Sequence, residues 1–186
     1  MRSDAARRRE AIIAHARHIF AQRGGDVALE TVAAAAGVGI ATLYRNFPSR
    51  NDLVRAVIDD MVQQILASVA QARDAVEADP EAAWAGLLAK LMDMELGALT
   101  DSLGLQAGSG PEDTPLAHLQ QPALDALDEL LAVLAQRKAV RTGITALGVV
   151  VAAATITRPQ VAAIREAAPD VPGQLAEAYL LWSRTA

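Results

Sequence analysis

The amino-acid sequence predicts an all-α protein, and three observations lead to this prediction. Aromatic residues make up only 3% of the 186 residues, and alanine and leucine predominate, which favours helices because both have high helix propensity. Apolar residues recur three and four positions apart through most of the chain, as on one face of a helix. No stretch shows the alternation of apolar and polar residues that a half-buried strand requires. We therefore expect about nine helices and no sheet.

Three helices are predicted at the N-terminal end. Residues 3–23 carry one apolar stripe, and a Gly-Gly pair ends this first helix. A short second helix covers 29–36, and residues 37–39 form a glycine-containing turn. A third helix covers 40–47 and is ended by Pro48, because proline cannot continue a helix.

The rest of the chain is predicted to be a helical bundle. Ser49 is a suitable N-cap for a long helix that reaches about residue 76. Asp79 followed by Pro80 predicts the start of the next helix, and residues 104–115, rich in Gly and Pro, predict a loop. Further helices are expected from Gln121–Pro122, over 145–156 with Thr145 as cap, near 160–167 and near 173–183.

Charge is unevenly distributed along the chain. Residues 1–56 carry nine arginines against five acidic residues, a net charge of +4, whereas residues 57–186 carry eight basic and seventeen acidic residues, a net charge of −9. Such asymmetry favours a nucleic-acid-facing head on an acidic body. Chance sorting of surface charge is the alternative.

Composition also indicates a cytoplasmic protein. Cysteine is absent, which excludes disulfides and thiolate chemistry. The charged N-terminal segment lacks the apolar stretch of a secretory signal. The longest apolar run, residues 144–156, is shorter than the roughly 20 residues that a membrane span needs, so no membrane partner is expected.

Two short helices joined by a three-residue turn form a helix-turn-helix pattern, in which the second helix enters the major groove of DNA. The segment 29–53, LETVAAAAGVGIATLYRNFPSRNDL, closely resembles the signature of the TetR/AcrR family of transcriptional regulators. The matching anchors are Ala33, Ala36-Gly37-Val38, Thr42-Leu43-Tyr44-Arg45, Phe47 and Leu53. The first helix, with Arg9, Ile12, Ala16, Phe20 and Gly24, also looks like the family's first helix. The signature covers only the first third of the chain.

Residues of the third helix supply groups suited to DNA. Thr42, Tyr44 and Asn46 can donate hydrogen bonds to phosphates, and Arg45 can pair with a guanine edge or a phosphate. The resemblance implies a phosphate contact for Arg50, and we assign Ile40 to the same surface. Tyr44 has an alternative role in packing on the first helix, and Arg7-Arg8-Arg9 either contacts phosphates or is a solvated arm. The residues predicted to fix the angle between the two helices are Val32, Ala36, Val38, Leu43 and Phe47.

Several positions depart from the family pattern. Ala28 and Gly39 stand where the family usually has Ser or Thr caps, and Ile40 and Ala34-Ala35 stand where basic or polar residues are common. A missing cap costs about 1 kcal/mol, and less where Gly stands in its place. Fewer phosphate contacts also mean a shallower dependence of binding on salt. We therefore expect modest DNA affinity.

In the family, the C-terminal helices form a two-fold dimer and enclose a small-molecule pocket, so the resemblance implies both here. The apolar helix 145–156 must be buried on more than one face, which a partner copy would provide. The dimer residues we predict are Leu147, Val150, Val151, Tyr179 and Trp182, with Leu175 beside them; an ordinary core helix of a monomer is the alternative. The pocket residues we predict are Trp84, Leu88, Leu91, Met92, Glu95, Leu103 and His118, with Met94 beside them. Glu95 is predicted to fall on the apolar stripe of its helix, where it meets a cationic ligand, pairs with an arginine or reaches solvent at the edge of the helix.

The sequence offers no constellation for catalysis, a metal or a cofactor. His15 and His18 share a helix face, but no nearby acidic residue or Cys completes a metal site. We expect a DNA-binding domain at 1–48 and a ligand-binding and dimerisation domain at 49–186. The function expected is a ligand-responsive homodimeric repressor, whose partners are a palindromic duplex DNA, a second copy and a small-molecule effector. An activator or a ligand-independent architectural regulator with the same fold, and a small-molecule-binding protein that has lost specific DNA binding, are alternatives.

Overall fold

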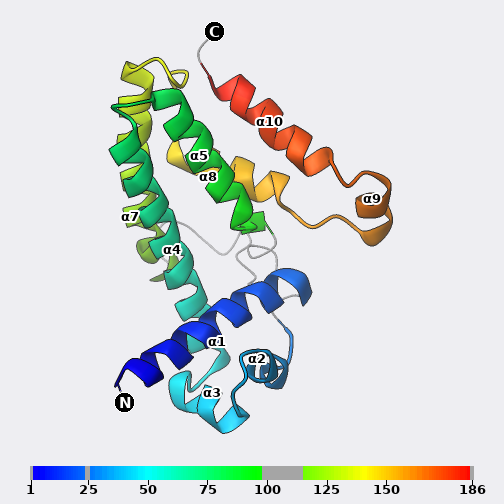
Figure 1. The fold of residues 1–186 in the computed structure, drawn as a ribbon. Coiled ribbons are helices and arrows are strands. Elements are labelled where there is room, and N and C mark those ends of the chain that lie inside the picture. The colour runs from blue at the N-terminus through cyan, green and yellow to red at the C-terminus, as the bar shows by residue number, and fades with distance from the viewer. Residues whose placement is uncertain (1, 24–25, 98–114, 185–186) are drawn as a thin grey trace. The chain divides into compact units, whose positions relative to one another are not determined.

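The computed structural model describes residues 2–23, 26–97 and 115–184. All regular secondary structure in these residues is helical, which confirms the predicted fold class (Figure 1). The helices are α1 (Arg2–Arg23), α2 (Leu29–Ala35), α3 (Ile40–Asn46), α4 (Arg50–Ala75), α5 (Pro80–Asp93), α7 (Pro115–Gln136), α8 (Ala146–Ile156), α9 (Ala162–Ala167) and α10 (Val171–Ser183). Among these described helices, none combines the length and the hydropathy of a membrane span.

The chain divides into two compact units, and the division falls within α4. Among the described residues, the first unit extends to Met61 and so holds α1, α2, α3 and the start of α4. The second unit holds Val62–Gly97 and residues 115–184.

The first unit is built around a closed apolar core. Ile12, Ala16 and Phe20 of α1 are completely buried, and they pack with Val32 of α2 and Leu43 of α3. Leu53 and Val57 complete the core from α4. This packing explains why two helices of only seven residues are stable, because short helices form in water only when tertiary contacts hold them.

The turn between α2 and α3 is a Schellman motif centred on Gly37. The amide of Val38 donates to the Ala33 carbonyl at 2.9 Å, and the amide of Gly37 donates to the Ala34 carbonyl at 3.1 Å. Gly37 has φ +66°, a left-handed conformation that glycine adopts without steric cost. The glycine-containing turn predicted from the sequence is therefore confirmed.

Two predicted helix caps of the second unit are also confirmed. The Asp79 carboxylate accepts a hydrogen bond from the Ala82 amide at 2.9 Å at the start of α5. The Thr145 hydroxyl accepts from the Gly148 amide at 3.1 Å at the start of α8. In addition, the Asp128 carboxylate of α7 accepts from the Ala146 amide at 2.6 Å, which fixes α8 against α7.

In the second unit, α5 and α7 pack against α8, and α10 packs against α5 and α8. The buried Trp84 indole of α5 donates a hydrogen bond of 2.7 Å to the buried Ser183 hydroxyl at the end of α10. Gly97 lies so close to the end of α8 that a Cβ there would overlap the Ala154 carbonyl oxygen and lie 2.6 Å from the Arg158 nitrogen. Its amide donates to the Thr157 hydroxyl at 3.0 Å.

Two sequence predictions about the second unit are wrong. Helix α7 begins at Pro115 rather than at Gln121–Pro122, so Pro122 lies inside the helix. Proline is well tolerated at a first helical position because its missing N–H would be unpaired there, and Pro115 takes that place. Glu95 does not continue the apolar stripe of α5, because the helix ends at Asp93 and Glu95 is an exposed residue with φ 51°.

Candidate nucleic-acid interface

The helix-turn-helix pair is fixed by the residues predicted for that purpose. Val32, Leu43 and Phe47 are almost completely buried, and Ala36 and Val38 are partly buried against the same core. The angle between α2 and α3 is therefore set by apolar packing and by the Gly37 turn, and the outer face of α3 remains open to solvent.

That outer face carries polar side chains. Tyr44 is 47% exposed and Arg45 is exposed, whereas Thr42 and Asn46 are half-buried. The Arg45 guanidinium folds back along its own helix and donates to the Ala41 carbonyl at 3.1 Å and to the Thr42 hydroxyl at 3.3 Å. These bonds at an exposed position are weak and exchange readily with water, so Arg45 can turn outward to an incoming phosphate or base.

Three other predicted DNA-binding residues make contacts within the chain. The Asn46 amide donates to the Thr42 carbonyl at 2.8 Å, within α3. Ile40 is half-buried and packs against the core of the first unit. Arg50, in the first turn of α4, donates to the Val27 carbonyl at 2.6 Å. Each of these side chains thus has a role inside the free protein.

The arginine run at the start of α1 is tied to neighbouring groups. Arg7 forms an ion pair with Asp4 at 3.1 Å, and the Arg8 guanidinium donates to the Asp4 carbonyl at 3.0 Å. The Arg9 guanidinium lies 5.0 Å from the centre of the Phe47 ring, a cation–π distance. No sequence pattern indicated this contact, which joins α1 to the end of α3.

Both helices of the motif lack a capping side chain, as the sequence predicted. Ala28 and Gly39 stand at the N-caps of α2 and α3, and neither supplies a side-chain hydrogen bond. Helix α4 is different, because the Ser49 hydroxyl accepts from the Asp52 amide at 3.2 Å and the Asp52 carboxylate accepts from the Ser49 amide at 3.0 Å. This reciprocal pair corresponds to a capping box with Asp in place of Glu.

The residues predicted to line a ligand pocket differ in how far they are buried. Trp84, Leu88 and Leu91 are buried in the core of the second unit, Met92 is half-buried, and Glu95 is exposed. Leu103 and the side chain of His118 lie outside the described residues.

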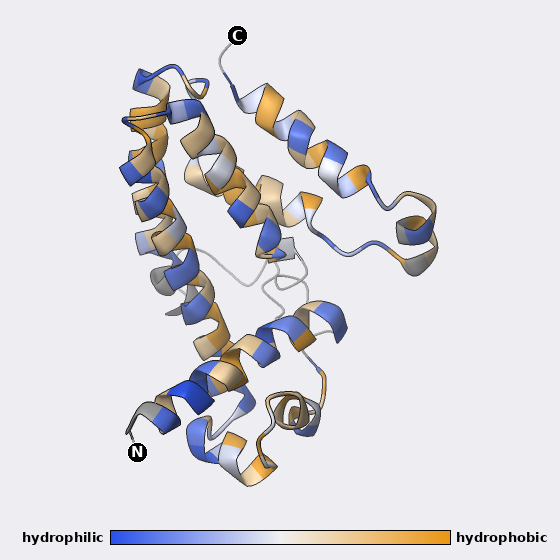
Figure 2. Ribbon diagram, viewed as in Figure 1, coloured by the Kyte–Doolittle hydropathy of each residue, from blue (hydrophilic) through white to orange (hydrophobic). Residues whose placement is uncertain are grey.

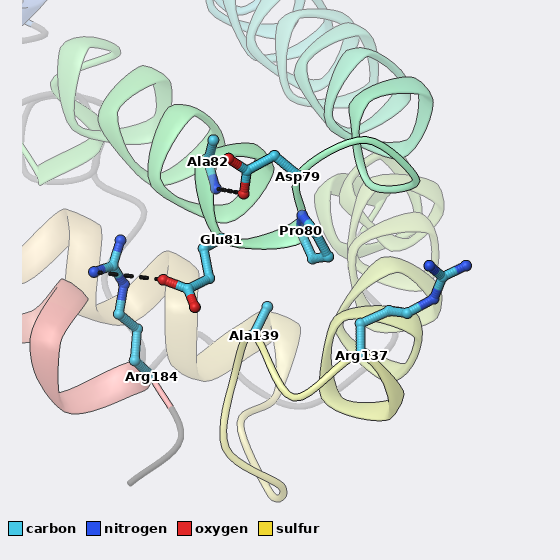
Figure 3. Close-up of a pocket in the computed structure, with 7 residues that line it drawn as sticks. All are labelled: Asp79, Pro80, Glu81, Ala82, Arg137, Ala139 and Arg184. Atoms are coloured by element: carbon cyan, nitrogen blue, oxygen red, sulfur yellow. Dashed lines mark hydrogen bonds and ion pairs between the residues drawn. The ribbon is translucent and has the colours of Figure 1, made fainter.

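A surface depression of about 550 Å³ lies elsewhere in the second unit (Figure 3). Its lining residues are Asp79, Pro80, Glu81, Ala82, Arg137, Ala139 and Arg184. The charges here are matched within the chain, because Arg137 pairs with Glu77 and Arg184 lies 3.9 Å from Glu81. The Arg137 hydrogen bond and its charge lower the pKa of Glu77 below the ordinary value.

The residues predicted for a dimer interface lie largely at the surface of the single chain. Leu147 and Val151 of α8 are 60% and 53% exposed, and Trp182 of α10 is 53% exposed. Val150 and Tyr179 are half-buried, and burial raises the pKa of Tyr179. The Tyr179 and Trp182 rings lie 5.4 Å apart, and the Arg141 guanidinium lies 4.9 Å from the Trp182 ring. Figure 2 shows hydrophobic stretches along both α8 and α10.

Metal binding finds no support in the part of the chain that the structure describes. No group of three or more His, Cys, Asp or Glu side chains lies close enough there to hold an ion. His18 is within 2.8 Å of the Gln22 amide on α1, and His15 is exposed on the same helix.

The chain is similar to known regulatory proteins both in sequence and in structure. Residues 12–57 match the family model described as "Bacterial regulatory proteins, tetR family". The chain is similar to a TetR transcription regulatory protein from Mycobacterium vanbaalenii, with 28% identity, a TM-score of 0.65 and 99% of each chain covered. It is similar to the TetR transcriptional regulator SCO0520 from Streptomyces coelicolor, with 28% identity, a TM-score of 0.64 and coverage of 96% of this chain and 99% of that one.

A third structure shares the fold at lower identity. It is the TetR-like regulator LfrR from Mycobacterium smegmatis in complex with proflavine, with 24% identity, a TM-score of 0.56 and coverage of 94% of this chain and 93% of that one. No curated protein sequence matches the chain.

Proposed function

We propose that this chain is a DNA-binding transcriptional regulator of the TetR type, and that it acts as a ligand-responsive homodimeric repressor of a palindromic operator. Residues 1–48 would form the DNA-binding domain, and residues 49–186 would bind the effector and dimerise. Two copies would place their α3 helices in successive major grooves, about 34–36 Å apart.

The observation that carries the proposal is the exposed polar face of α3 on a closed core. Leu43 and Phe47 anchor the helix, while Tyr44 and Arg45 on its other side remain open to solvent. A short helix held in this way can enter the major groove without rearrangement. The +4 charge of residues 1–56 adds the electrostatic attraction that binding to phosphates requires.

Homodimer formation is supported by the exposed apolar residues of α8 and α10. Leu147, Val151 and Trp182 are each more than half exposed, and large apolar surfaces of this kind typically mark protein–protein contacts. The second copy would cover residues on both helices.

Effector binding is the part of the proposal that rests on the fold. LfrR, which shares the fold, is in complex with proflavine, and we expect this chain likewise to bind a small-molecule effector. An effector would act by binding one arrangement of the dimer more tightly than the other, and the shift cannot exceed that difference in affinity.

Selection from a pool of random duplex DNA tests the proposal directly. The purified chain should enrich a palindrome whose half-sites lie about one helical turn apart. Arg45→Ala and Tyr44→Ala should abolish the enrichment, whereas the matched control Arg73→Ala, on the part of α4 within the second unit, should not. Failure of the wild-type chain to enrich any sequence would refute operator binding and favour the alternative of a small-molecule-binding protein.

Sedimentation equilibrium tests the dimer. Leu147→Glu and Val151→Glu should each shift the chain toward monomer, because a buried unpaired carboxylate is costly. Ala132→Glu, at an exposed position of α7, serves as the matched control and should leave the mass unchanged. A wild-type chain that stays monomeric at high concentration would contradict the proposal.

A further inference from the structure

The entry to α2 depends on a side chain from a distant part of the first unit. The Arg50 guanidinium, at the start of α4, donates to the Val27 carbonyl at 2.6 Å across 23 positions of sequence. Both residues are partly buried, and Val27 packs against the core of the first unit. A charged donor on a partly buried carbonyl makes one of the stronger hydrogen bonds found in proteins.

The first turn of α2 is held by the buried Leu29 side chain, but it has no side-chain cap. Ala28 occupies the N-cap and offers no side-chain acceptor, and the Thr31 amide donates to the Ala28 carbonyl at 3.0 Å. The orientation of α2 in turn constrains α3, because the two helices pack against each other and two hydrogen bonds fix the Gly37 turn to the end of α2. Any displacement at residue 27 would therefore reach the groove-facing helix.

We infer that Arg50 is a positioning residue. It fixes the start of α2 by donating to the Val27 carbonyl, and it thereby sets the orientation of α3. This differs from the phosphate contact that the family resemblance implies for Arg50. The inference rests on the proposed function, since the orientation of α3 matters only to a protein that binds DNA through this helix. Arg50 would act in the free protein, before any DNA is present.

Hydrogen–deuterium exchange of the DNA-free protein is the first test. In Arg50→Gln, amides of residues 27–35 should exchange about tenfold faster, while amides in the middle of α1 keep wild-type rates. Arg45→Gln is the matched control and should leave all of these rates unchanged. Wild-type exchange in Arg50→Gln would overturn the inference, because a pure phosphate contact does nothing in the free protein.

Salt dependence of DNA binding is the second test, with the enriched palindrome and a scrambled duplex of equal length as probes. Arg50→Gln should weaken binding to the palindrome about tenfold, leave the scrambled duplex unaffected and preserve the slope of log K against log salt. Arg45→Gln should reduce that slope by about one. A slope reduced by about one in Arg50→Gln, with both probes weakened, would mean a phosphate contact instead.

A second variant guards against loss of folding. Arg50→Met keeps the aliphatic stem and removes the donor, so it should reproduce the exchange result. Unfolding of both Arg50 variants beside a folded Arg45→Gln would also support the inference, because removal of a solvent-facing contact leaves a free protein intact. If the wild-type chain binds no duplex, the proposed function fails, while the exchange test still decides the role of Arg50.

Discussion

The helices of the first unit and the last two helices of the chain differ in how completely they bury their apolar residues. In the first unit, Ile12, Phe20, Val32, Leu43 and Phe47 are essentially inaccessible. In α9, α10 and the residues around them, six large apolar side chains are exposed, namely Val161, Ile164, Val171, Leu175, Leu181 and Trp182. A single chain thus buries the apolar residues of the first unit, but it leaves many of those in α9 and α10 exposed to solvent. Helix α3 is therefore held in place within one chain, whereas α9 and α10 leave apolar side chains uncovered in the single chain.

The sharpest contrast should come from truncating one apolar residue in each region. Phe47→Ala should lower the free energy of unfolding by about 3–5 kcal/mol, because it opens a cavity in a closed core. Leu181→Ala, at a 61% exposed position, should change it by no more than about 0.5 kcal/mol at low protein concentration. Urea unfolding followed by circular dichroism measures both values. Similar losses of unfolding free energy in the two variants would show that the two regions do not differ in how tightly they are packed.

Gly97→Ala tests whether the second unit contains a tightly packed region of its own. A Cβ would overlap the Ala154 carbonyl oxygen and lie 2.8 Å from the Arg158 Cα, so the backbone must shift. We expect a loss of about 1–3 kcal/mol in the same urea experiment. Gly86→Ala is the matched control, since nothing lies within 4 Å of a Cβ there, and it should not destabilise the protein. Equal stability of the two variants would show that the close approach has no energetic weight.

Substitutions of two glycines in the first unit distinguish the effect of backbone strain from the effect of helix capping. Gly37→Ala should cost about 1 kcal/mol, because φ of +66° strains a residue that carries a Cβ although no atom obstructs it. Gly39→Ser should instead stabilise the protein by a few tenths of a kcal/mol, because it supplies the missing N-cap of α3. Thermal unfolding of both variants measures the pair. A stabilised Gly37→Ala would contradict the left-handed turn.

The smallest effect is expected at the Glu77–Arg137 pair, which lies at the surface. The pKa of Glu77 is lowered in the folded chain by the hydrogen bond from Arg137, so the stabilisation is present above the unfolded pKa of about 4.3 and is lost as pH falls through the folded value. Glu77→Gln should therefore lower the melting temperature slightly at pH 6 and not at pH 2. High salt should remove the difference. A larger effect in acid than at neutral pH would reverse the sign and disprove the argument.

Much of the fold follows from local sequence signals. Asp79 before Pro80, Thr145 before an apolar run and Gly37 between two short helices each act within a few residues, so their caps and turns could be predicted. Pro122 misled because the helix was already started by Pro115 seven residues earlier. Glu95 misled because the left-handed residue that ends α5 is a glutamate, where glycine is the usual signal.

The candidate site was predictable in its location but not in its internal contacts. The motif of residues 29–53 places Tyr44 and Arg45 on an accessible helix, as its spacing indicates. The contact of Arg9 with Phe47 and that of Arg50 with the Val27 carbonyl join residues 38 and 23 positions apart. Such pairings depend on tertiary geometry, and no local pattern encodes them.

The hydrogen bond between Trp84 and Ser183 gives α10 one fixed end. Ser183 is also held by its carbonyl, which accepts from the Arg141 amide at 2.8 Å, while Asp170 at the opposite end supplies no side-chain cap. Opening of this helix should therefore begin at Val171 and progress toward Trp182, so that the free energy of local unfolding rises along the helix. The N-terminal end of α10 would then open more readily than its C-terminal end, and it would adjust to a surface that packs against it.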